Sequence, residues 1–354
     1  MTDELGRIVI DEIRPSTPRG HPAKAAVGEA VRVSADIYKD GHDVLAARVR
    51  WSGPDGEWTT APLRELGNDR WEGVIEPTTV GRHRFVVEAW TDAYATWRHK
   101  ATVKVEAKQD VGLELEEAAR MFEARRDESG EENGGFLDEV VRSLRDEGAS
   151  PDDRLAPAME PAAARLVAGP SGAPDWTKSE PMPLWVDRER GLVGAWYELF
   201  PRSLGGFAGT AHHLDAVAAM GFDVVYLPPV HPIGHQHRKG PNNTLAAGPD
   251  DVGSPWAIGG PEGGHTAIHP DLGTVDEFRA LVDRAAQLGM EVALDYALQC
   301  SPDHPWVSEH PEWFHSRPDG SIAYAENPPK KYQDIYPLNF DNDPAGLYAE
   351  VLRV

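Results

Sequence analysis

Apolar and polar positions alternate with a period of two through the first hundred residues, which is the pattern of half-buried β-strands. The alternation is clear over residues 31–37 and 85–89, and it returns at Val103 and Val105. Turn-forming segments such as SGPDGE separate the apolar runs. About seven short strands at this spacing are typical of an antiparallel, immunoglobulin-like β-sandwich, which we predict for residues 1–107.

The period changes to that of an α-helix after residue 107. Four apolar residues between Leu115 and Phe122 share one helix face, and residues 136–144 repeat the pattern. We predict a helical spacer over residues 108–165, in which the segment RRDESGEENGG is a charged loop between two helices. Residues 166–190 contain many prolines and glycines without periodicity, so we expect a linker there.

Continuous apolar strands alternate with amphipathic helices from residue 191 onward. The runs DVVYL and VALD are apolar on both faces, as in a buried parallel sheet. A helix over 274–288 separates them and begins with a capping box formed by Thr274 and Glu277. This order predicts an α/β domain of successive strand–helix–strand units. The irregular stretch from about residue 301 is typical of a binding loop or a small inserted subdomain.

The composition of the chain argues against some classes of binding partner and cellular location. The chain has 35 Lys and Arg against 58 Asp and Glu, a net charge of −23, which argues against nucleic acid and anionic membranes as main partners. No apolar run reaches the ~18 residues of a membrane helix. A single cysteine excludes a disulfide framework, and no signal peptide is visible at the N-terminus. These features predict a cytoplasmic protein.

Polar residues gather directly after the two buried strands, where parallel α/β folds bind their ligands. The loop PVHPIGHQHRKGPNN follows the first strand, and YALQCSPDHPW follows the second. The spacing of His231, His235 and His237 inside a proline-rich loop is not that of a zinc motif. The glycine-rich segment GSPWAIGGPEGGH lacks the pattern of a nucleotide-binding loop. We therefore predict no metal and no cofactor.

Several side chains allow two interpretations. Cys300 could be a nucleophile, although its place after a buried strand favours a packed thiol. The indoles of Trp256, Trp306 and Trp313 suit either a core or stacking on sugar rings. The residues alone favour a solvated surface pair for Lys330 and Lys331, and an anion-binding loop is the alternative.

Residues 253–299 resemble the barrel of the α-amylase superfamily, glycoside hydrolase family thirteen. This resemblance implies a (β/α)8 barrel, and because residues 191–354 supply three of its eight strand–helix units, we expect a partial barrel with the start of an inserted loop subdomain from about residue 301. The matching features are a YLPP run at Tyr226–Pro229, the GSP…HPDLGT segment, and a third strand that ends in Asp295. That family usually continues as Asp-x-x-x-Asn-His. Gln299 and Cys300 occupy the last two positions here, a departure from an ordinary amylase.

Longer strings resemble the bacterial α-1,4-glucan:maltose-1-phosphate maltosyltransferase family along the whole chain: GAWYELFPRS, HPIGHQHRKGPNN, LDYALQCSPDHPW and ENPPKKYQDIYPLNF. This resemblance implies transfer of maltosyl units from α-maltose 1-phosphate to the non-reducing end of an α-1,4-glucan, with release of phosphate, in elongation of glycogen and other α-glucans. It implies a retaining double displacement without a metal, performed by a homodimer of full-length chains.

The resemblance also implies ligand contacts at particular positions. Lys239, Asn243 and Gln299 match contacts to the donor sugar. The loop that receives the phosphate is matched by Asn327, Lys330 and Tyr332, and Asp334 matches a further ligand-contacting position. Cations and neutral donors at these places suit a phosphate dianion bound by an otherwise acidic chain.

Retaining chemistry needs two carboxyl groups about 5 Å apart. In the superfamily they are an Asp within Arg-x-Asp after the fourth strand and a Glu after the fifth. No such motif follows a predicted strand after Asp295, so we expect both groups beyond Val354, and we expect the 354-residue chain alone to be inactive and prone to aggregate. Two alternatives stay open, an amylase-like glycoside hydrolase and a non-catalytic glucan-binding fragment.

Overall fold

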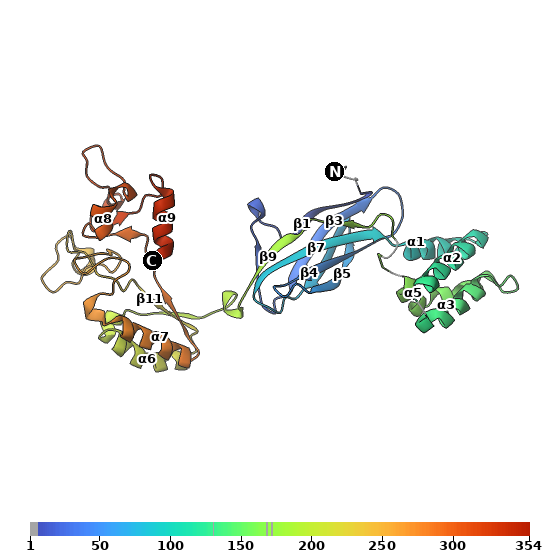
Figure 1. Cartoon of the computed structure of the whole chain (residues 1–354), viewed down its shortest axis with the longest axis horizontal. Helices are drawn as coiled ribbons and strands as arrows, with labels where there is room; N and C mark the ends of the chain where they lie inside the picture. Colours follow the sequence, from blue (N-terminus) through green and yellow to red (C-terminus); the bar gives the residue numbers. More distant parts are fainter. Residues whose placement is uncertain (1–5, 130, 168, 171–172) are drawn as a thin grey trace. The chain divides into compact units, whose positions relative to one another are not determined.

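The computed structural model describes residues 6–129, 131–167, 169–170 and 173–354. The chain forms two compact units, Met1–Val193 and Gly194–Val354, here called the N-terminal and the C-terminal unit (Figure 1). Within the described residues, no helix has both the length and the apolar character needed to cross a membrane.

A curled β-sheet forms the first part of the N-terminal unit. Its strands follow the order β1-β3-β6-β5-β4-β7-β9-β2, and β8 pairs with β7. Their bounds are β1 (Ile8–Arg14), β2 (Ala23–Ala26), β3 (Val31–Lys39), β4 (Leu45–Ser52), β5 (Trp58–Gly67), β6 (Arg70–Ile75), β7 (Gly81–Thr91), β8 (Thr177–Lys178) and β9 (Met182–Asp187).

Strand β5 lets the sheet fold over on itself. Its first residues pair with β4 and its last residues pair with β6, so two layers face one apolar core. Alternate residues of β3 and β7, among them Val33, Phe85 and Val87, are fully buried in that core. The predicted inward positions of these strands are therefore confirmed. In β7, however, Val86 and Glu88 between them are buried too, so the predicted alternation of buried and exposed positions is wrong over 85–89.

The expected linker at 166–190 contains two of the strands. Leu184 and Val186 of β9 are buried in the sheet core, and β9 pairs with β7 on one side and with β2 on the other. The expectation of a linker was wrong for this segment, because the alternation in MPLWVD is short and lies between prolines and charged residues.

The expected strand at Val103 and Val105 is also wrong. Both residues lie in helix α1 (Ala93–Glu106), whose first turn is capped by Asp92 accepting from the backbone N–H of Ala95 at 2.8 Å. Tyr94, Trp97 and Ala101 recur at helical spacing and are buried, whereas Val103 is 48% exposed. The apolar face of the helix therefore determines the structure of this segment, and the alternation of two valines does not.

Five helices pack around a second core in the N-terminal unit, and they follow one another in sequence: α1, α2 (Gly112–Ser129), α3 (Glu131–Leu144), α4 (Pro151–Met159) and α5 (Pro161–Val167). Phe122 of α2 and Leu137 of α3 are fully buried between them, which confirms the predicted helical faces. The segment predicted as a charged loop is mostly helical, because α2 and α3 extend through it on both sides.

A parallel three-stranded sheet organises the C-terminal unit. Its strands are β10 (Trp196–Glu198), β11 (Val224–Leu227) and β12 (Glu291–Leu294), in that order. Helices α6 (Phe207–Ala219) and α7 (Val275–Gln287) lie side by side against it (Figure 1). The capping box between Thr274 and Glu277 is present, so the predicted strand–helix–strand order and the predicted helix start are confirmed.

The short helix η2 (Glu189–Gly191) belongs to the end of the N-terminal unit. The remaining segments of the C-terminal unit are short: η3 (Pro201–Leu204), η4 (Pro241–Asn243), η5 (Pro270–Leu272), β13 (Gln299–Cys300), α8 (Pro305–Glu309), η6 (Pro311–Trp313), β14 (Ala325–Asn327), β15 (Lys330–Tyr332), β16 (Tyr336–Pro337) and α9 (Pro344–Arg353). Trp306, Trp313, Phe314 and Leu347 form their own apolar core around Cys300. Two of the three tryptophans with two interpretations are therefore core residues.

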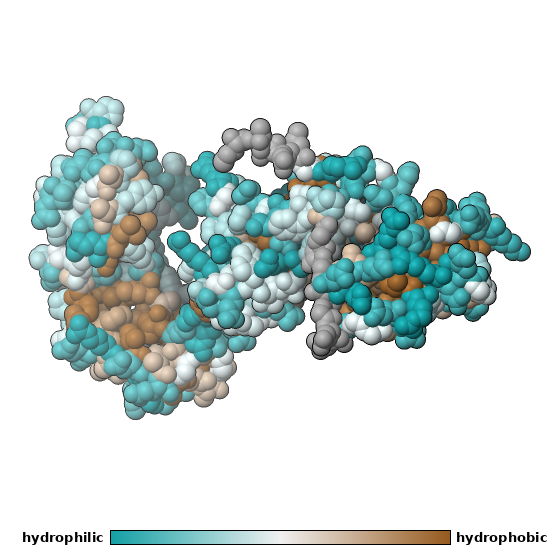
Figure 2. Space-filling model, turned by 45° about the vertical axis from the view of Figure 1, so that its right-hand side comes forward, coloured by the Kyte–Doolittle hydropathy of each residue, from teal (hydrophilic) through white to brown (hydrophobic). Residues whose placement is uncertain are grey.

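Apolar side chains remain exposed in the C-terminal unit. Trp196 of β10 is 57% exposed and Leu294 of β12 is 40% exposed, although both lie in the sheet. A hollowed apolar area is visible on the surface of this unit (Figure 2). Exposed apolar surface of this kind favours association, and aggregation of the isolated chain stays a prediction.

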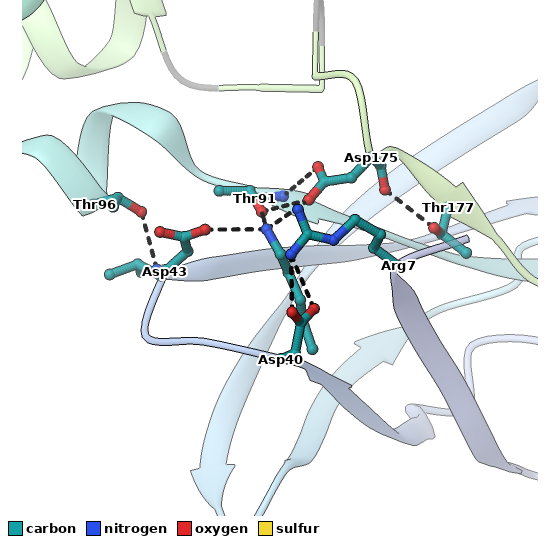
Figure 3. A network of polar contacts seen from close by, with 9 residues as sticks. Arg7, Asp40, Asp43, Thr91, Thr96, Asp175 and Thr177 are labelled. Carbon is teal, nitrogen blue, oxygen red and sulfur yellow. Dashed lines mark hydrogen bonds and ion pairs between the residues drawn. The ribbon is translucent and has the colours of Figure 1, made fainter. Parts of the chain in front are cut away.

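A polar network fixes the segment before β8 to the sheet of the N-terminal unit (Figure 3). Asp175 accepts hydrogen bonds from Lys39 Nζ at 2.9 Å and from the backbone N–H and hydroxyl of Thr91 at 3.1 and 2.6 Å. Burial alone would raise the pKa of Asp175, but the bonds from Thr91 and Lys39 lower it to about 2. The network thus ties a late segment of the unit to β3 and β7.

Candidate functional site

A buried lysine lies in the loop that follows β11. Lys239 is only 5% exposed, and its ammonium donates to Gln333 Oε1 at 2.9 Å. Among the described residues, no ion pair links Lys239 to a carboxylate. A buried cation whose hydrogen-bond partner is a neutral amide keeps donors for a ligand, so this arrangement suits a site that receives an anionic ligand.

Asp334 lies next to Gln333 in sequence and is also buried, at 2% exposure. Its Oδ1 atom is buried and has no hydrogen-bond partner. Burial raises the pKa of Asp334, while the backbone and the charges of Lys239 and His237 oppose that rise. A ligand hydroxyl is the kind of donor that would satisfy this oxygen.

Asp303 pins the loop that carries Lys239. One carboxylate oxygen of Asp303 accepts from the backbone N–H groups of His235 and Gln236, at 2.6 and 2.8 Å, and the other accepts from Gln236 Nε2 at 2.6 Å. Burial would raise the pKa of Asp303, but these hydrogen bonds lower it on balance. The start of the loop is therefore held against the segment before α8.

The carboxyl ends of β11 and β12 carry a second polar group. Asp295, directly after β12, accepts from Trp256 Nε1 at 2.7 Å. Its hydrogen bond to the phenol of Tyr226 raises the pKa of that tyrosine to about 12. Gln299 donates from Nε2 to the backbone carbonyl of Trp256 at 3.0 Å. Trp256, the third tryptophan for which a core position and stacking on sugar rings were both open, is half-buried here.

The predicted phosphate loop is a short hairpin. Strands β14 and β15 pair antiparallel, with Asn327 directly opposite Lys330, and a cis Pro328–Pro329 bond joins them. Asn327 and Lys330 are exposed, and Tyr332 is half-buried at the end of β15. Because Gln333 and Asp334 follow β15 immediately, the hairpin leads into the contact with Lys239.

The structure brings some of the predicted site residues together and leaves others apart. Lys239 meets the segment of Asp334 through Gln333, and Asn327 lies opposite Lys330. Gln299 belongs to the cluster at Asp295. No hydrogen bond among the described residues joins Asn243 to any other member of the predicted set, although its φ of +61° marks a tight local turn.

A chain of hydrogen bonds links two buried histidines beside this region. The backbone N–H of Trp306 donates to His304 Nδ1 at 3.0 Å, so the proton of that neutral ring is on Nε2. His304 Nε2 donates to His265 Nδ1 at 3.0 Å, and His265 Nε2 donates to the carbonyl of Ala297 at 2.8 Å. Burial lowers the pKa of His304 to about 3 and that of His265 to about 4, so both rings are neutral near pH 7.

His265, Cys300 and His304 have ligand atoms within 4.8 Å of one another, a set that could suit a soft metal ion. A metal bound at His304 Nε2 would move the ring proton to Nδ1, where the N–H of Trp306 already points. Burial also raises the pKa of the Cys300 thiol well above its usual value, which disfavours a thiolate ligand. The donor set therefore fits a packed, neutral cluster better than a metal centre, and Cys300 is a packed thiol.

Steric contacts explain why this loop is rich in glycine. A Cβ at Gly259 would lie 2.5 Å from His304 Cδ2, and a Cβ at Gly264 would overlap His304 Nε2. The backbone of GGPEGGH thus passes close to the imidazole of His304, which only glycine permits. The sequence showed this glycine cluster but not its partner, because His304 lies some forty residues later.

Gln333 and Asp303 were missed by sequence reasoning. Neither belongs to a motif with recognisable spacing, and each acts on a residue far away in the chain. A polar residue flanked by predicted site residues, as Gln333 is by Tyr332 and Asp334, is the only indication that the sequence offers.

Parallel strands with polar clusters at their carboxyl ends, packed against α6 and α7, make this unit an α/β domain of the class that binds ligands at the strand ends. Residues 186–346 match the profile of the alpha amylase catalytic domain. Residues 6–188 match the profile described as alpha-1,4-glucan:maltose-1-phosphate maltosyltransferase, domain N/S. The chain belongs to the α-1,4-glucan:maltose-1-phosphate maltosyltransferase family.

Proteins named as such maltosyltransferases are similar along almost the whole chain. One from Streptomyces coelicolor is 53% identical, covering 99% of this chain and 54% of its own length. Those from Arcanobacterium haemolyticum and Mycolicibacterium smegmatis are 50% and 46% identical, with 99% of this chain and 54% and 56% of their own lengths covered. The chain therefore spans about half the length of these curated relatives.

Among solved structures, a pullulanase type I from Bacillus subtilis complexed with maltose aligns with 94% of this chain and 40% of its own. The identity is 11% and the TM-score is 0.31, which is too low to indicate a shared fold.

Proposed function

We propose that this chain carries the donor-binding part of a maltosyltransferase that moves maltosyl from α-maltose 1-phosphate to the non-reducing end of an α-1,4-glucan. One observation carries the proposal. Lys239 is a buried cation with a neutral partner, at the strand ends where ligands bind in this fold. An amylase acting on neutral glucan has no use for such a charge, whereas a sugar phosphate neutralises it.

Each predicted contact has a role in this proposal. Lys239, Asn243 and Gln299 hold the donor sugar, and Asp334 accepts a hydrogen bond from a sugar hydroxyl. The hairpin residues Asn327, Lys330 and Tyr332 receive the phosphate. The exposure of Asn327 and Lys330 supports this last role, because the leaving phosphate needs a route to solvent.

The proposed reaction is a double displacement with retention. A carboxylate attacks C1 of the maltosyl unit as the C1–O bond to phosphate breaks, and the departing phosphate takes the proton of a second carboxyl group. The 4-hydroxyl of the glucan then attacks C1, gives its proton back to that second group and releases the first carboxylate. We propose that both carboxylates lie outside the 354 residues, and that Asp295 orders Tyr226 and Trp256 beside the reacting sugar.

The wider expectations from the sequence and from the resemblance remain part of the proposal. They are an immunoglobulin-like identity for the sandwich of the N-terminal unit, a homodimer, a role in glycogen elongation, and a cytoplasmic location. The two-layer sheet with one core supports the first of these. The net charge of −23 supports partners that are neither nucleic acid nor membrane.

Calorimetric titration of the purified chain with α-maltose 1-phosphate, maltose and inorganic phosphate tests the proposal. We expect the sugar phosphate to bind at least about tenfold more tightly than maltose, because a charge-assisted contact is added. Lys330→Met should remove most of this preference, whereas Lys331→Met, the matched control in the same strand, should keep it because neighbouring strand residues point to opposite faces.

Equal affinity for maltose and its phosphate would contradict a phosphorylated donor. Glucan binding with no preference for the phosphate would instead favour the glucan-binding fragment. A second assay follows phosphate release from α-maltose 1-phosphate with glycogen present, and sugar release from starch alone. Sugar release from starch would favour the amylase-like hydrolase.

A further inference from the structure

Gln333 is the direct partner of the buried lysine. Its Oε1 atom accepts from Lys239 Nζ at 2.9 Å across 94 positions of sequence. An ammonium has three N–H donors, so this bond leaves two for a ligand. The bond also fixes the direction of a long side chain that otherwise has four rotatable bonds.

The identity of residue 333 matters as much as its position. An amide oxygen satisfies one donor of the ammonium and leaves the positive charge intact. A carboxylate at the same place would form an ion pair and neutralise it. Among the described residues, the neighbouring carboxyl group of Asp334 makes no ion pair with Lys239, although the two groups interact electrostatically, so the direct partner of the ammonium is the neutral amide.

The contact also joins two loops. Lys239 belongs to the segment pinned by Asp303, and Gln333 follows the hairpin that carries Lys330. Loss of the bond would therefore loosen the hairpin from the loop after β11, in addition to releasing the ammonium.

We infer that Gln333 is a positioning residue, which aims the ammonium of Lys239 at the bound donor without neutralising it. The link to a sugar phosphate rests on the proposed function, whereas the control of Lys239 by Gln333 does not. Gln333 itself contacts the lysine, and it acts on the ligand through that lysine.

The experiment measures acylation of Lys239 by acetic anhydride in the full 354-residue chain, by peptide mass spectrometry, with the exposed Lys24 as internal reference. Gln333→Leu removes the acceptor and frees the amine, so we expect acylation about tenfold faster than in the unchanged chain. Gln333→Glu places a carboxylate against the ammonium, so we expect it about tenfold slower. Gln287→Leu, an exposed glutamine of α7, should change nothing.

Opposite directions for the two variants are the decisive result, because a variant that merely loosened the fold would speed acylation in both. Equal rates in all chains, or a change in the same direction in both, would overturn the inference. Titration with α-maltose 1-phosphate then separates the two claims. If the unchanged chain binds no sugar phosphate while the rates diverge as expected, the inference holds and the proposed function fails. If it binds tightly while the rates are equal, the inference alone fails.

Discussion

His304 donates a hydrogen bond from Nε2 to Nδ1 of His265 across 3.0 Å, and every other ring nitrogen of the pair is already engaged with the backbone. Only one arrangement of protons satisfies all three bonds, with both rings neutral and both protons on Nε2. The pair joins the glycine-rich loop, the segment after β12 and the start of α8. It therefore fixes, in one small cluster, the loops that surround the candidate site.

Acid should destabilise the C-terminal unit through this pair. The folded-state pKa values, about 4 for His265 and about 3 for His304, lie below the value of about 6.5 expected in an unfolded chain. Their stabilising contribution is thus complete above about pH 6.5 and is lost as the pH falls toward 4. Each histidine should change the unfolding constant by roughly tenfold per pH unit in that window.

Urea unfolding of the chain between pH 7 and 4.5 measures this effect, with His265→Phe as the comparison. Phenylalanine preserves stacking on Trp306, which lies 4.9 Å from the imidazole of His265, but it cannot take up a proton. The variant should be less stable at pH 7 and should lose part of the pH dependence. An unchanged slope with pH would show that these histidines do not titrate in this range.

Glycine at position 259 should be essential for stability. Its φ is +110°, and a Cβ there would lie 2.5 Å from His304 Cδ2. We expect Gly259→Ala to cost about 3 kcal/mol or more, because strain in the backbone adds to overlap with a packed side chain. Gly248→Ala is the matched control, since its Cβ would meet only Asp251 Oδ2 at an ordinary 3.4 Å. Thermal unfolding of both variants decides the matter, and equal melting temperatures would contradict it.

Most of the elements that were predicted correctly were predicted from local periodicity. The helix at 275–287 can be predicted from a capping box and an apolar face, both of which lie within fifteen residues. The same reasoning failed at Val103, where two alternating valines lie on a helix whose buried face was set by Tyr94 and Trp97. It also failed at β9, because a strand of six residues gives too few alternations to be distinguished from a loop.

The site was less predictable than the fold, and the reason is physical. Positions such as Lys239 and Gln299 could be singled out because they follow buried strands or match a family pattern. Gln333, Asp303 and His304 act through contacts over 39 to 94 positions of sequence, and no local pattern encodes such contacts. Side-chain partners of this kind become visible only when the loops are folded.

Removing the charge of Asp175 should weaken the N-terminal unit. Asp175 and Lys39 have side-chain exposures of 10% and 6%, so Asp175→Asn leaves a buried cation without its main partner. We expect a loss of about 3 kcal/mol in the free energy of unfolding. Asp40→Asn should cost less than about 0.5 kcal/mol, because its ion pair with Arg7 in the same network is exposed (Figure 3). Chemical denaturation at pH 7 compares the two.

The dependence of this pair on pH has a definite sign. The folded-state pKa of Asp175 is about 2, below the value of about 3.9 in an unfolded chain. Its contribution is therefore present above about pH 4 and is lost as the pH falls from there toward 2. The difference in stability between the unchanged chain and Asp175→Asn should shrink over this window, and a constant difference would contradict the assignment.

Asp303 should control the loop that carries Lys239 without controlling the fold. Its carboxylate receives three hydrogen bonds from His235 and Gln236, so Asp303→Ala removes every one of these bonds. We expect amide hydrogen exchange at residues 235–240 to accelerate about tenfold or more, because two backbone N–H groups lose their acceptor. Exchange in α7 should stay unchanged, since that helix has its own cap and buried face. The control is Asp319→Ala, which breaks only two local hydrogen bonds from Ser321 and should leave 235–240 protected. Equal acceleration in α7 and in the loop would mean that Asp303 supports the whole unit, and it would remove the reason to regard this residue as the anchor of the lysine loop.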